Sequence, residues 1–424
     1  MREVTTIATP PFLARLLAPR LPFYYGWIVL GCLCLAGFAR QGPAVAVLSV
    51  FVVPMTEAFG WSRTAVAGAV SLGGLLAAFV SPMLGPFVDR RGTRLVLCLA
   101  VLSVGLCCMA LSLVESLLAF YLLFCFARMT WAGPFDLGLY AALNNWFIAR
   151  RTVATAFATL AQMSGLVAIP IIAQLAMQDG GWRSGWVAVG ATVLIVGFLP
   201  VWLFLVRRPE DLGLAADHVA PGKGAGAEPR FSRAEALRTR AFWLLALYTV
   251  LVYPVQAGVS LHQAPHLIER GIAPLTAATV ISAFSAMSSV ASFAVGFVPR
   301  RVPVRFTMCG AGVLLASGTF GLIFVHGVDL AYVAAALFGL GIGGVMTLLP
   351  VAWADYFGRE SFGAIRGVAL SLQVLAQAVG PVLSGVLRDL TGDYVLSLTL
   401  FGGLATLAAV AALMTQRPRE VPAG

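Results

Sequence analysis

The chain alternates between long apolar stretches and short polar ones, and this pattern predicts membrane-spanning helices. A helix that crosses the roughly 30 Å hydrocarbon core of a bilayer needs about 20 mostly apolar residues. Twelve segments of the 424-residue chain meet this requirement. They are Gly26–Val53, Ala65–Val88, Leu95–Val114, Leu117–Phe147, Val153–Ala176, Trp186–Val206, Ala241–Leu261, Leu275–Val298, Phe306–Phe324, Leu330–Val351, Gly367–Leu387 and Val395–Met414. We therefore expect an all-α integral membrane protein with twelve transmembrane helices.

The composition excludes the common soluble classes of protein. Hydrophobic residues make up 60% of the chain and charged residues 11%, whereas a soluble domain is about 45–50% apolar and about 25% charged. Such a chain could not cover a soluble surface without large apolar patches. This excludes a soluble enzyme, a disordered regulator and a nucleic-acid-binding protein. The seven cysteines all lie in apolar runs without zinc-site spacing, so we expect no metal, and no motif indicates a cofactor.

The positive charges indicate how the helices are oriented. If the N-terminus is cytoplasmic, 22 of the 28 Lys and Arg residues fall in cytoplasmic segments, four fall in outer loops, and Arg40 and Arg128 lie inside spans. Cytoplasmic loops of membrane proteins are enriched in Lys and Arg. The net charge of +10 is therefore explained by topology rather than by a nucleic-acid partner. We expect a multi-pass protein of the cell inner membrane with both termini in the cytoplasm.

The two halves of the chain resemble each other. An offset of 211 residues aligns polar or backbone-special residues of the same type. Examples are Pro54 with Pro265, Gly60 with Gly271, Tyr121 with Tyr332, Gln162 with Gln373 and Pro170 with Pro381. The only long connection joins the halves, and its middle, Ala220–Pro229, has the composition of a flexible linker. We expect six-helix halves over residues 1–206 and 241–424, with a cytoplasmic linker over 207–240. Duplicated halves are typical of alternating-access carriers.

The most specific motif lies between the second and third predicted spans. It reads GPFVDRRGTR over residues 85–94, and its glycines permit a tight turn. It resembles the G-x-x-x-D-R-x-G-x-R signature of the major facilitator superfamily, matched at Gly85, Asp89, Arg90, Gly92 and Arg94. The resemblance implies the twelve-helix major facilitator fold and makes these five residues candidates for a conformational gate. The second copy, over residues 296–305, has Arg300 in place of the Asp.

Two further segments resemble signatures of one branch of that superfamily. Gly26-Trp27 opens the first span, and WFIARRTVA over residues 146–154 opens the fifth. Both are similar to signatures of the monocarboxylate porters and the related oxalate/formate-type carriers. Tyr24 and Tyr25 stand before Gly26, where that branch has an acidic residue. The resemblance implies a monocarboxylate-like substrate. The helix-eight Arg and Asp of that branch have no counterpart within Leu275–Val298.

Two arginines lie near mid-membrane and are the leading candidates for substrate binding. Arg40 is 13 residues past Trp27, and Arg128 is 13 residues past Glu115, which places each about 20 Å from its end of the span. A charge at that depth costs at least about 2.5–3.5 kcal/mol. We expect two unpaired cations whose repulsion a bound carboxylate would relieve. The alternative is a structural role, in which the arginines bind carbonyls of Ala39 and Thr130 that Pro43 and Pro134 free.

Other residues in the spans are weaker candidates, each with a structural alternative. Asp136 is the only acidic residue inside a predicted span and is a candidate for proton coupling; its alternative is pairing with a cytoplasmic Arg. His262 and His266, near the outer end of span seven, are pH-sensitive candidates or solvated side chains. Tyr253, Trp131 and Trp353 could contact substrate or pack in the core. The glycines of the GLGIGG run over residues 339–344 indicate a close helix contact.

These observations predict a secondary active transporter that moves a small organic anion by proton symport or exchange, and that works as a monomer. The alternative within transport is a carrier of a neutral or amphipathic metabolite, such as a riboflavin-like vitamin or a drug. A membrane enzyme or a signalling receptor is a third class. The chain contains no H-E-x-x-H or G-x-S-x-G motif, which disfavours an enzyme.

Overall fold

All regular structure in the described chain is helical. The computed structural model describes residues 10–61, 63–218, 229–298 and 302–418. In these ranges eleven helices are long and apolar enough to cross a membrane. The first predicted span instead forms two shorter apolar helices, α2 (Gly26–Ala39) and α3 (Val45–Phe59). With that pair counted as one crossing, the predicted all-α fold with twelve crossings is confirmed.

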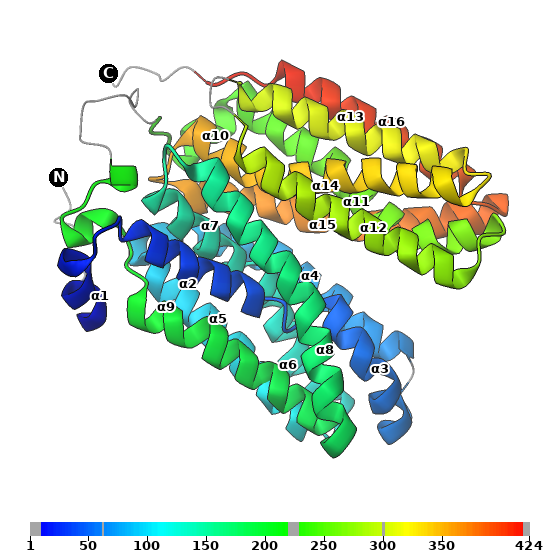
Figure 1. Ribbon diagram of the computed structural model, residues 1–424, viewed down its shortest axis with the longest axis horizontal. Helices are drawn as coiled ribbons and strands as arrows, with labels where there is room; N and C mark the ends of the chain where they lie inside the picture. The colour runs from blue at the N-terminus through cyan, green and yellow to red at the C-terminus, as the bar shows by residue number, and fades with distance from the viewer. Residues whose placement is uncertain (1–9, 62, 219–228, 299–301, 419–424) are drawn as a thin grey trace. The chain divides into compact units, whose positions relative to one another are not determined.

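The chain divides into two compact units, Met1–Ala154 with Ala161–Glu228, and Thr155–Leu160 with Pro229–Gly424. In Figure 1 the first unit runs from blue to green and the second from green to red. Besides α2 and α3, the helices that begin in the first unit are α1 (Phe12–Leu17), α4 (Arg63–Arg91), α5 (Thr93–Ala110), α6 (Leu117–Ala132), α7 (Pro134–Trp146), α8 (Arg151–Thr192) and α9 (Leu199–Phe204). Those of the second unit are α10 (Arg233–Arg238), α11 (Arg240–Glu269), α12 (Pro274–Gly296), α13 (Val304–Ile323), α14 (Val328–Phe357), α15 (Phe362–Thr391) and α16 (Val395–Met414).

Two predicted spans of the first unit are broken in the middle, each at a Gly-Pro pair. α2 ends at Ala39, shortly before Gly42-Pro43, and α6 ends at Ala132, directly before Gly133-Pro134. Proline lacks a backbone N–H and clashes within a helix, but it suits a first turn, and Pro134 is the first residue of α7. Both breaks lie near the middle of predicted spans, beside the charged residues described below.

The second unit contains unusually close helix contacts, made possible by the glycine run of α14. A Cβ atom at Gly339 or Gly343 would overlap the backbone of α12 at Phe284 or Ser288. Gly341 and Gly344 face α13 instead, at Leu315 and Ala311. Small residues let helix backbones approach closely where lipid provides no hydrophobic driving force. The close helix contact expected from this run is confirmed.

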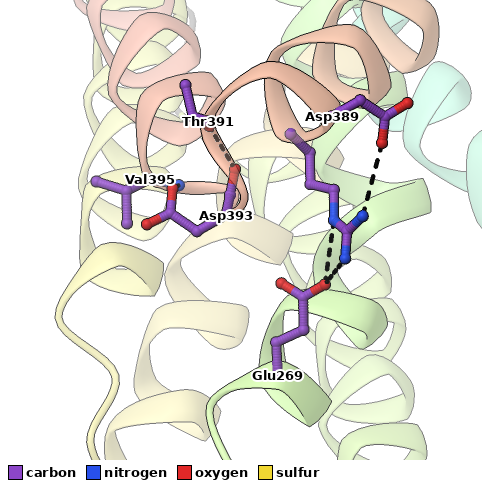
Figure 2. Close-up of polar contacts among 6 residues, drawn as sticks. Glu269, Asp389, Thr391, Asp393 and Val395 are labelled. Carbon is purple, nitrogen blue, oxygen red and sulfur yellow. Dashed lines mark hydrogen bonds and ion pairs between the residues drawn. The ribbon is translucent and has the colours of Figure 1, made fainter.

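An ion-pair cluster joins the ends of α11 and α15. Nη2 of Arg388 lies 3.0 Å from Oε1 of Glu269, and its Nη1 lies 3.6 Å from Oδ1 of Asp389 (Figure 2). At the start of α16, the backbone N–H of Val395 donates to Oδ1 of Asp393 at 3.0 Å. The charge of Arg388 is therefore balanced locally by two acidic residues.

Candidate functional site

A buried polar cluster lies at the broken helices of the first unit, with Arg40 at its centre. Arg40 follows the last residue of α2, and its Nη1 lies 3.0 Å from Oδ1 of Asp136 in the first turn of α7. The two side chains are only 8% and 6% exposed, so this is a buried ion pair. The same Nη1 donates to Oε1 of Gln162 at 2.8 Å, and Nε donates to the carbonyl oxygen of Trp131 at 3.1 Å. Arg40 is thus held from three helices.

Arg128 has a different environment, although it belongs to the same cluster. Its Nη1 donates to the carbonyl oxygen of Pro43 at 3.3 Å, and its Cζ lies 3.9 Å from the ring centroid of Trp131. The Cζ atom of Arg40 lies 4.7 Å from the same centroid. Within the described part of the chain, no carboxylate lies within ion-pair distance of Arg128. The two arginines therefore share an indole ring, but only Arg40 has a counter-charge.

Close helix packing brings these groups together. A Cβ atom at Gly165 of α8 would overlap the backbone of Phe38, so α8 lies directly against the end of α2. Gln162, one turn earlier on α8, can then reach Arg40, and its Nε2 donates to the hydroxyl of Tyr140 at 3.2 Å. In the same way, Gly73 of α4 lies against the side chain of Arg128. Glycines at contact points thus position the polar cluster.

The structure corrects the expectation of two unpaired arginines. Arg128 and Asp136 are eight residues apart in sequence, about 12 Å along a continuous helix, which is too far for a direct contact. Asp136 pairs with Arg40 from another helix, because the Gly133-Pro134 break starts α7 beside the end of α2. The partner of Asp136 in this ion pair is Arg40, which lies inside a predicted span, rather than a cytoplasmic arginine. Both arginines donate to carbonyl oxygens at the breaks, but these carbonyls belong to Trp131 and Pro43 rather than to the expected Ala39 and Thr130.

The repeated glutamines have similar roles in the two units. Oε1 of Gln162 accepts from Arg40, and Oε1 of its repeat partner Gln373 accepts from Nη2 of Arg366 at 3.0 Å. Arg366 is 2% exposed and lies near the start of α15, the same helix as Gln373. Each unit therefore anchors a buried arginine with a glutamine at the same repeat position. Only the first unit places that arginine at a mid-span break.

The candidate residues Trp353 and Tyr253 belong to the second unit. Trp353 is fully buried in α14, with its ring 5.3 Å from that of Phe242. This contact is the aromatic core packing expected as its alternative role. Tyr253 is buried in α11, directly before Pro254. Neither residue lies in the same compact unit as Arg128.

The two histidines surround Tyr394 near the ends of α11 and α15. The ring centroid of His262 lies 5.3 Å from that of Tyr394, and His266 lies 6.0 Å from it. His266 is buried, and its Nε2 lies 2.8 Å from the carbonyl oxygen of Leu322 in the last turn of α13. His262 is partly exposed, and its Nδ1 lies 3.2 Å from the carbonyl oxygen of Gly258. His262 is therefore the more accessible of the two to solvent protons.

The signature motif begins within α4 and ends in α5. Gly85, Asp89 and Arg90 belong to the last two turns of α4, and only Gly92 lies outside a helix. Gly92 has φ +88°, a conformation that favours glycine, and a side chain there would overlap Arg207. Asp89 has a polar partner. The motif thus provides the sharp turn expected of it.

Arg94 and its neighbours bind α9 and the chain that follows it. Nη2 of Arg94 donates to the carbonyl oxygen of Trp202 at 2.9 Å. The hydroxyl of Thr93 donates to the carbonyl oxygen of Arg207 at 3.4 Å. Arg207 itself pairs with Asp211 through Nη2 and Oδ1, which lie 3.4 Å apart. The signature motif therefore holds the start of the predicted linker.

The second signature segment binds the same linker. Nε1 of Trp146 donates to the carbonyl oxygen of Val206 at 2.9 Å. Further along, Oδ2 of Asp217 accepts from the backbone N–H of Ile148 at 2.6 Å and from that of Ala149. The linker was expected to be flexible over Ala220–Pro229, which lies outside the described residues except for Pro229. Its first part is a docked segment of the first unit.

Sequence reasoning missed three residues of these sites: Gln162, Tyr140 and Asp217. Sequence analysis identified Gln162 only as a repeat position. A polar amide inside an apolar span could also have indicated a buried hydrogen-bonding partner. Asp217 gave no signal, since an acidic residue in a polar linker looks solvated. In the described chain, no group of three His, Cys, Asp or Glu side chains could hold a metal ion.

Comparisons with known proteins identify the family. The model of the Major Facilitator Superfamily matches residues 29–381 and 263–424. Human monocarboxylate transporter 11 is 27% identical over 393 residues, which cover 90% of this chain and 80% of that protein. The membrane sensor protein UhpC of Escherichia coli is 26% identical over 372 residues, covering 81% and 82%.

A solved structure supports the fold independently. The human organic anion transporter MFSD10 (TETRAN) superposes with a TM-score of 0.68 at 17% identity, covering 92% of this chain and 98% of that one. At this identity the likeness concerns the fold alone. The signature turn, the helical architecture and the family match over most of the chain agree. The protein belongs to the major facilitator superfamily and resembles its monocarboxylate-transporter branch.

Proposed function

We propose that this membrane protein transports a small organic anion with a single carboxylate, and that Arg128 binds that carboxylate. The observation that carries the proposal is the contrast between the two buried arginines. Arg40 has Asp136 at 3.0 Å, whereas Arg128 has a carbonyl oxygen and an indole ring. A cation at membrane depth costs several kcal/mol unless it is compensated. A substrate carboxylate would compensate it with charge-assisted hydrogen bonds.

Arg40 serves in this proposal as a positioning residue as well as a binding candidate. It holds the end of α2 against α7 and α8, and its guanidinium group orients Trp131 next to Arg128. The Trp131 ring contacts both guanidinium groups. Its contribution to binding is therefore to align the arginines by cation–π contact.

Asp136 is the candidate for proton coupling. It is the only acidic residue inside a predicted span, and it forms an ion pair with Arg40 that protonation would weaken. Protonation of Asp136 would remove the counter-charge of Arg40 and loosen the contact between α2 and α7. We propose proton symport or exchange on this basis. His262 and His266, beside Tyr394, remain secondary candidates.

The relatives support an anionic substrate over the alternatives. One relative is a monocarboxylate transporter, and the match covers 80% of its length. The sensor among the relatives shows that signalling occurs on related chains. In the present proposal the signature residues Gly85, Asp89, Arg90, Gly92 and Arg94 form the conformational gate, in a cell inner membrane with both termini cytoplasmic. A reporter active only outside the cell, fused after Gly424, should stay silent.

Uptake by purified protein in liposomes tests the function. We would compare labelled lactate and benzoate with labelled riboflavin, with and without an inward proton gradient. The account predicts saturable uptake of a monocarboxylate, which the gradient accelerates and Arg128→Gln abolishes. Arg183→Gln is the matched control, since Arg183 is an exposed arginine of the same unit beside Trp182. Uptake of riboflavin alone would favour the neutral-metabolite carrier, and binding without uptake would favour a sensor.

A further inference from the structure

Few charged residues lie away from the ends of the predicted spans. In the predicted spans of the whole sequence, only Arg40, Arg128 and Asp136 lie away from the span ends. All three belong to the first compact unit. The helices of the second unit carry their acidic and basic residues only in the turns near their ends, as Arg240 and Glu269 do in α11. These three side chains therefore supply the formal charges away from the ends of the predicted spans.

These three charges sum to one positive charge, and the geometry shows which residue carries it. Arg40 and Asp136 cancel each other across 3.0 Å in a buried pair. Arg128 keeps its charge with only the carbonyl oxygen of Pro43 and the Trp131 ring as partners in the described chain. Neither partner carries a formal negative charge. An anion that binds Arg128 therefore meets a net charge of +1.

We propose that Asp136 determines the charge of the substrate: by neutralising Arg40, it leaves the site complementary to an anion with one negative charge. This inference rests on the proposed function and names a specificity-determining residue for it. A monoanion makes the loaded site neutral. A dianion would leave one uncompensated negative charge, and a neutral solute would leave Arg128 uncompensated. At an effective permittivity of about 20, one unit charge within about 10 Å changes binding by on the order of tenfold or more.

Three charge-changing variants test the proposal. Asp136→Asn raises the charge of the cluster to +2 and should shift preference towards dianions. Arg40→Gln lowers it to zero and should weaken the binding of every anion. The double variant, Arg40→Gln with Asp136→Asn, restores +1 through Arg128 alone and should restore the preference for monoanions. The last prediction separates charge from geometry, because the double variant lacks both wild-type side chains.

Equilibrium binding to purified protein in detergent at pH 7.5 tests this with two matched series of probes. One series is benzoate, phthalate and benzamide, and the other is butyrate, succinate and butyramide. Wild type should bind the monocarboxylate of a series at least about tenfold more tightly than the dicarboxylate, and Asp136→Asn should reverse that order. Glu57→Gln is the control, because it removes an exposed acid near the end of α3 in the same unit and should leave the order unchanged. Thermal denaturation confirms that each variant is folded.

The outcomes separate this inference from the proposed function. If wild type binds the monocarboxylates and Asp136→Asn keeps the same order, Asp136 does not set substrate charge, although the protein still binds organic anions. If the double variant prefers dianions as Asp136→Asn does, net charge is not the determinant and the inference is also wrong. If wild type binds only the neutral amides, both the inference and the proposed anion function fail.

Discussion

The ion pair between Arg40 and Asp136 should contribute far more to stability than an exposed pair of the same length. Nη1 of Arg40 and Oδ1 of Asp136 lie 3.0 Å apart, with side chains 8% and 6% exposed. At an effective permittivity of about 20, two unit charges at that distance attract by about 5 kcal/mol. Removing one partner of a buried pair typically costs about 3–5 kcal/mol, because the other charge stays buried without compensation. We therefore expect Arg40→Gln to lower the free energy of unfolding by about 3–5 kcal/mol.

A second ion pair of the same length, but exposed to solvent, is the control for the effect of burial on stability. Nη2 of Arg388 and Oε1 of Glu269 also lie 3.0 Å apart, but these side chains are 42% and 35% exposed (Figure 2). Solvent-exposed pairs contribute about 0–1 kcal/mol. Arg388→Gln should therefore change stability by less than about 1 kcal/mol.

The assay is reversible unfolding in mixed micelles at a fixed pH of 8. The double variant of Arg40→Gln with Asp136→Asn removes both charges, so it should be more stable than Arg40→Gln alone. The coupling energy of the cycle should reach about 2 kcal/mol or more. If the two single variants are additive, or if Arg40→Gln is no worse than Arg388→Gln, the buried ion pair does not hold the broken helices together.

Three further predictions concern the rest of the fold. Gly343→Ala should destabilise the protein by about 1–3 kcal/mol, because the added methyl overlaps the backbone of Ser288; Gly310→Ala in α13, where the Cβ atom meets open space, should be neutral or stabilising in the same unfolding assay. Asp217→Ala should speed hydrogen exchange at the amides of Ile148 and Ala149, which it accepts from, while amides in the middle of α7 stay protected; equal exchange rates in the two proteins would contradict the docked linker. Asp89→Asn should slow transport in liposomes with little change in substrate affinity, and a collapse of affinity at normal cycling rates would argue against its role in the gate.

Much of the fold could be predicted because the membrane constrains it strongly. A span must satisfy its backbone hydrogen bonds internally and be about 20 residues long, so apolar length is a reliable signal. The exceptions were the two broken spans. Gly42-Pro43 and Gly133-Pro134 were visible in the sequence, but the extent of the irregular backbone depends on side chains such as Arg40 that stabilise it.

The candidate site could be predicted only in part, because its key contact joins different helices. Sequence spacing gives the distance between Arg128 and Asp136 along one axis, but it gives no distance between Asp136 and Arg40. That pair depends on the Gly133-Pro134 break, which starts α7 beside the end of α2. The linker was harder still, since Asp217 binds backbone amides that carry no sequence signal.

The most direct test of the central claim is the affinity of the Arg128 variants for a labelled monocarboxylate at fixed pH. The probe is the carboxylate that wild type transports in liposomes. Arg128→Gln should weaken binding by at least about thirtyfold, since a charge-assisted hydrogen bond in a buried site is worth about 1.5–3 kcal/mol and a bidentate contact makes two. Arg128→Lys should recover only part of the loss, because it keeps the charge without the planar fork. Arg183→Gln should bind as wild type does. If Arg128→Gln binds the carboxylate as tightly as wild type, the anion is held elsewhere and the account is wrong.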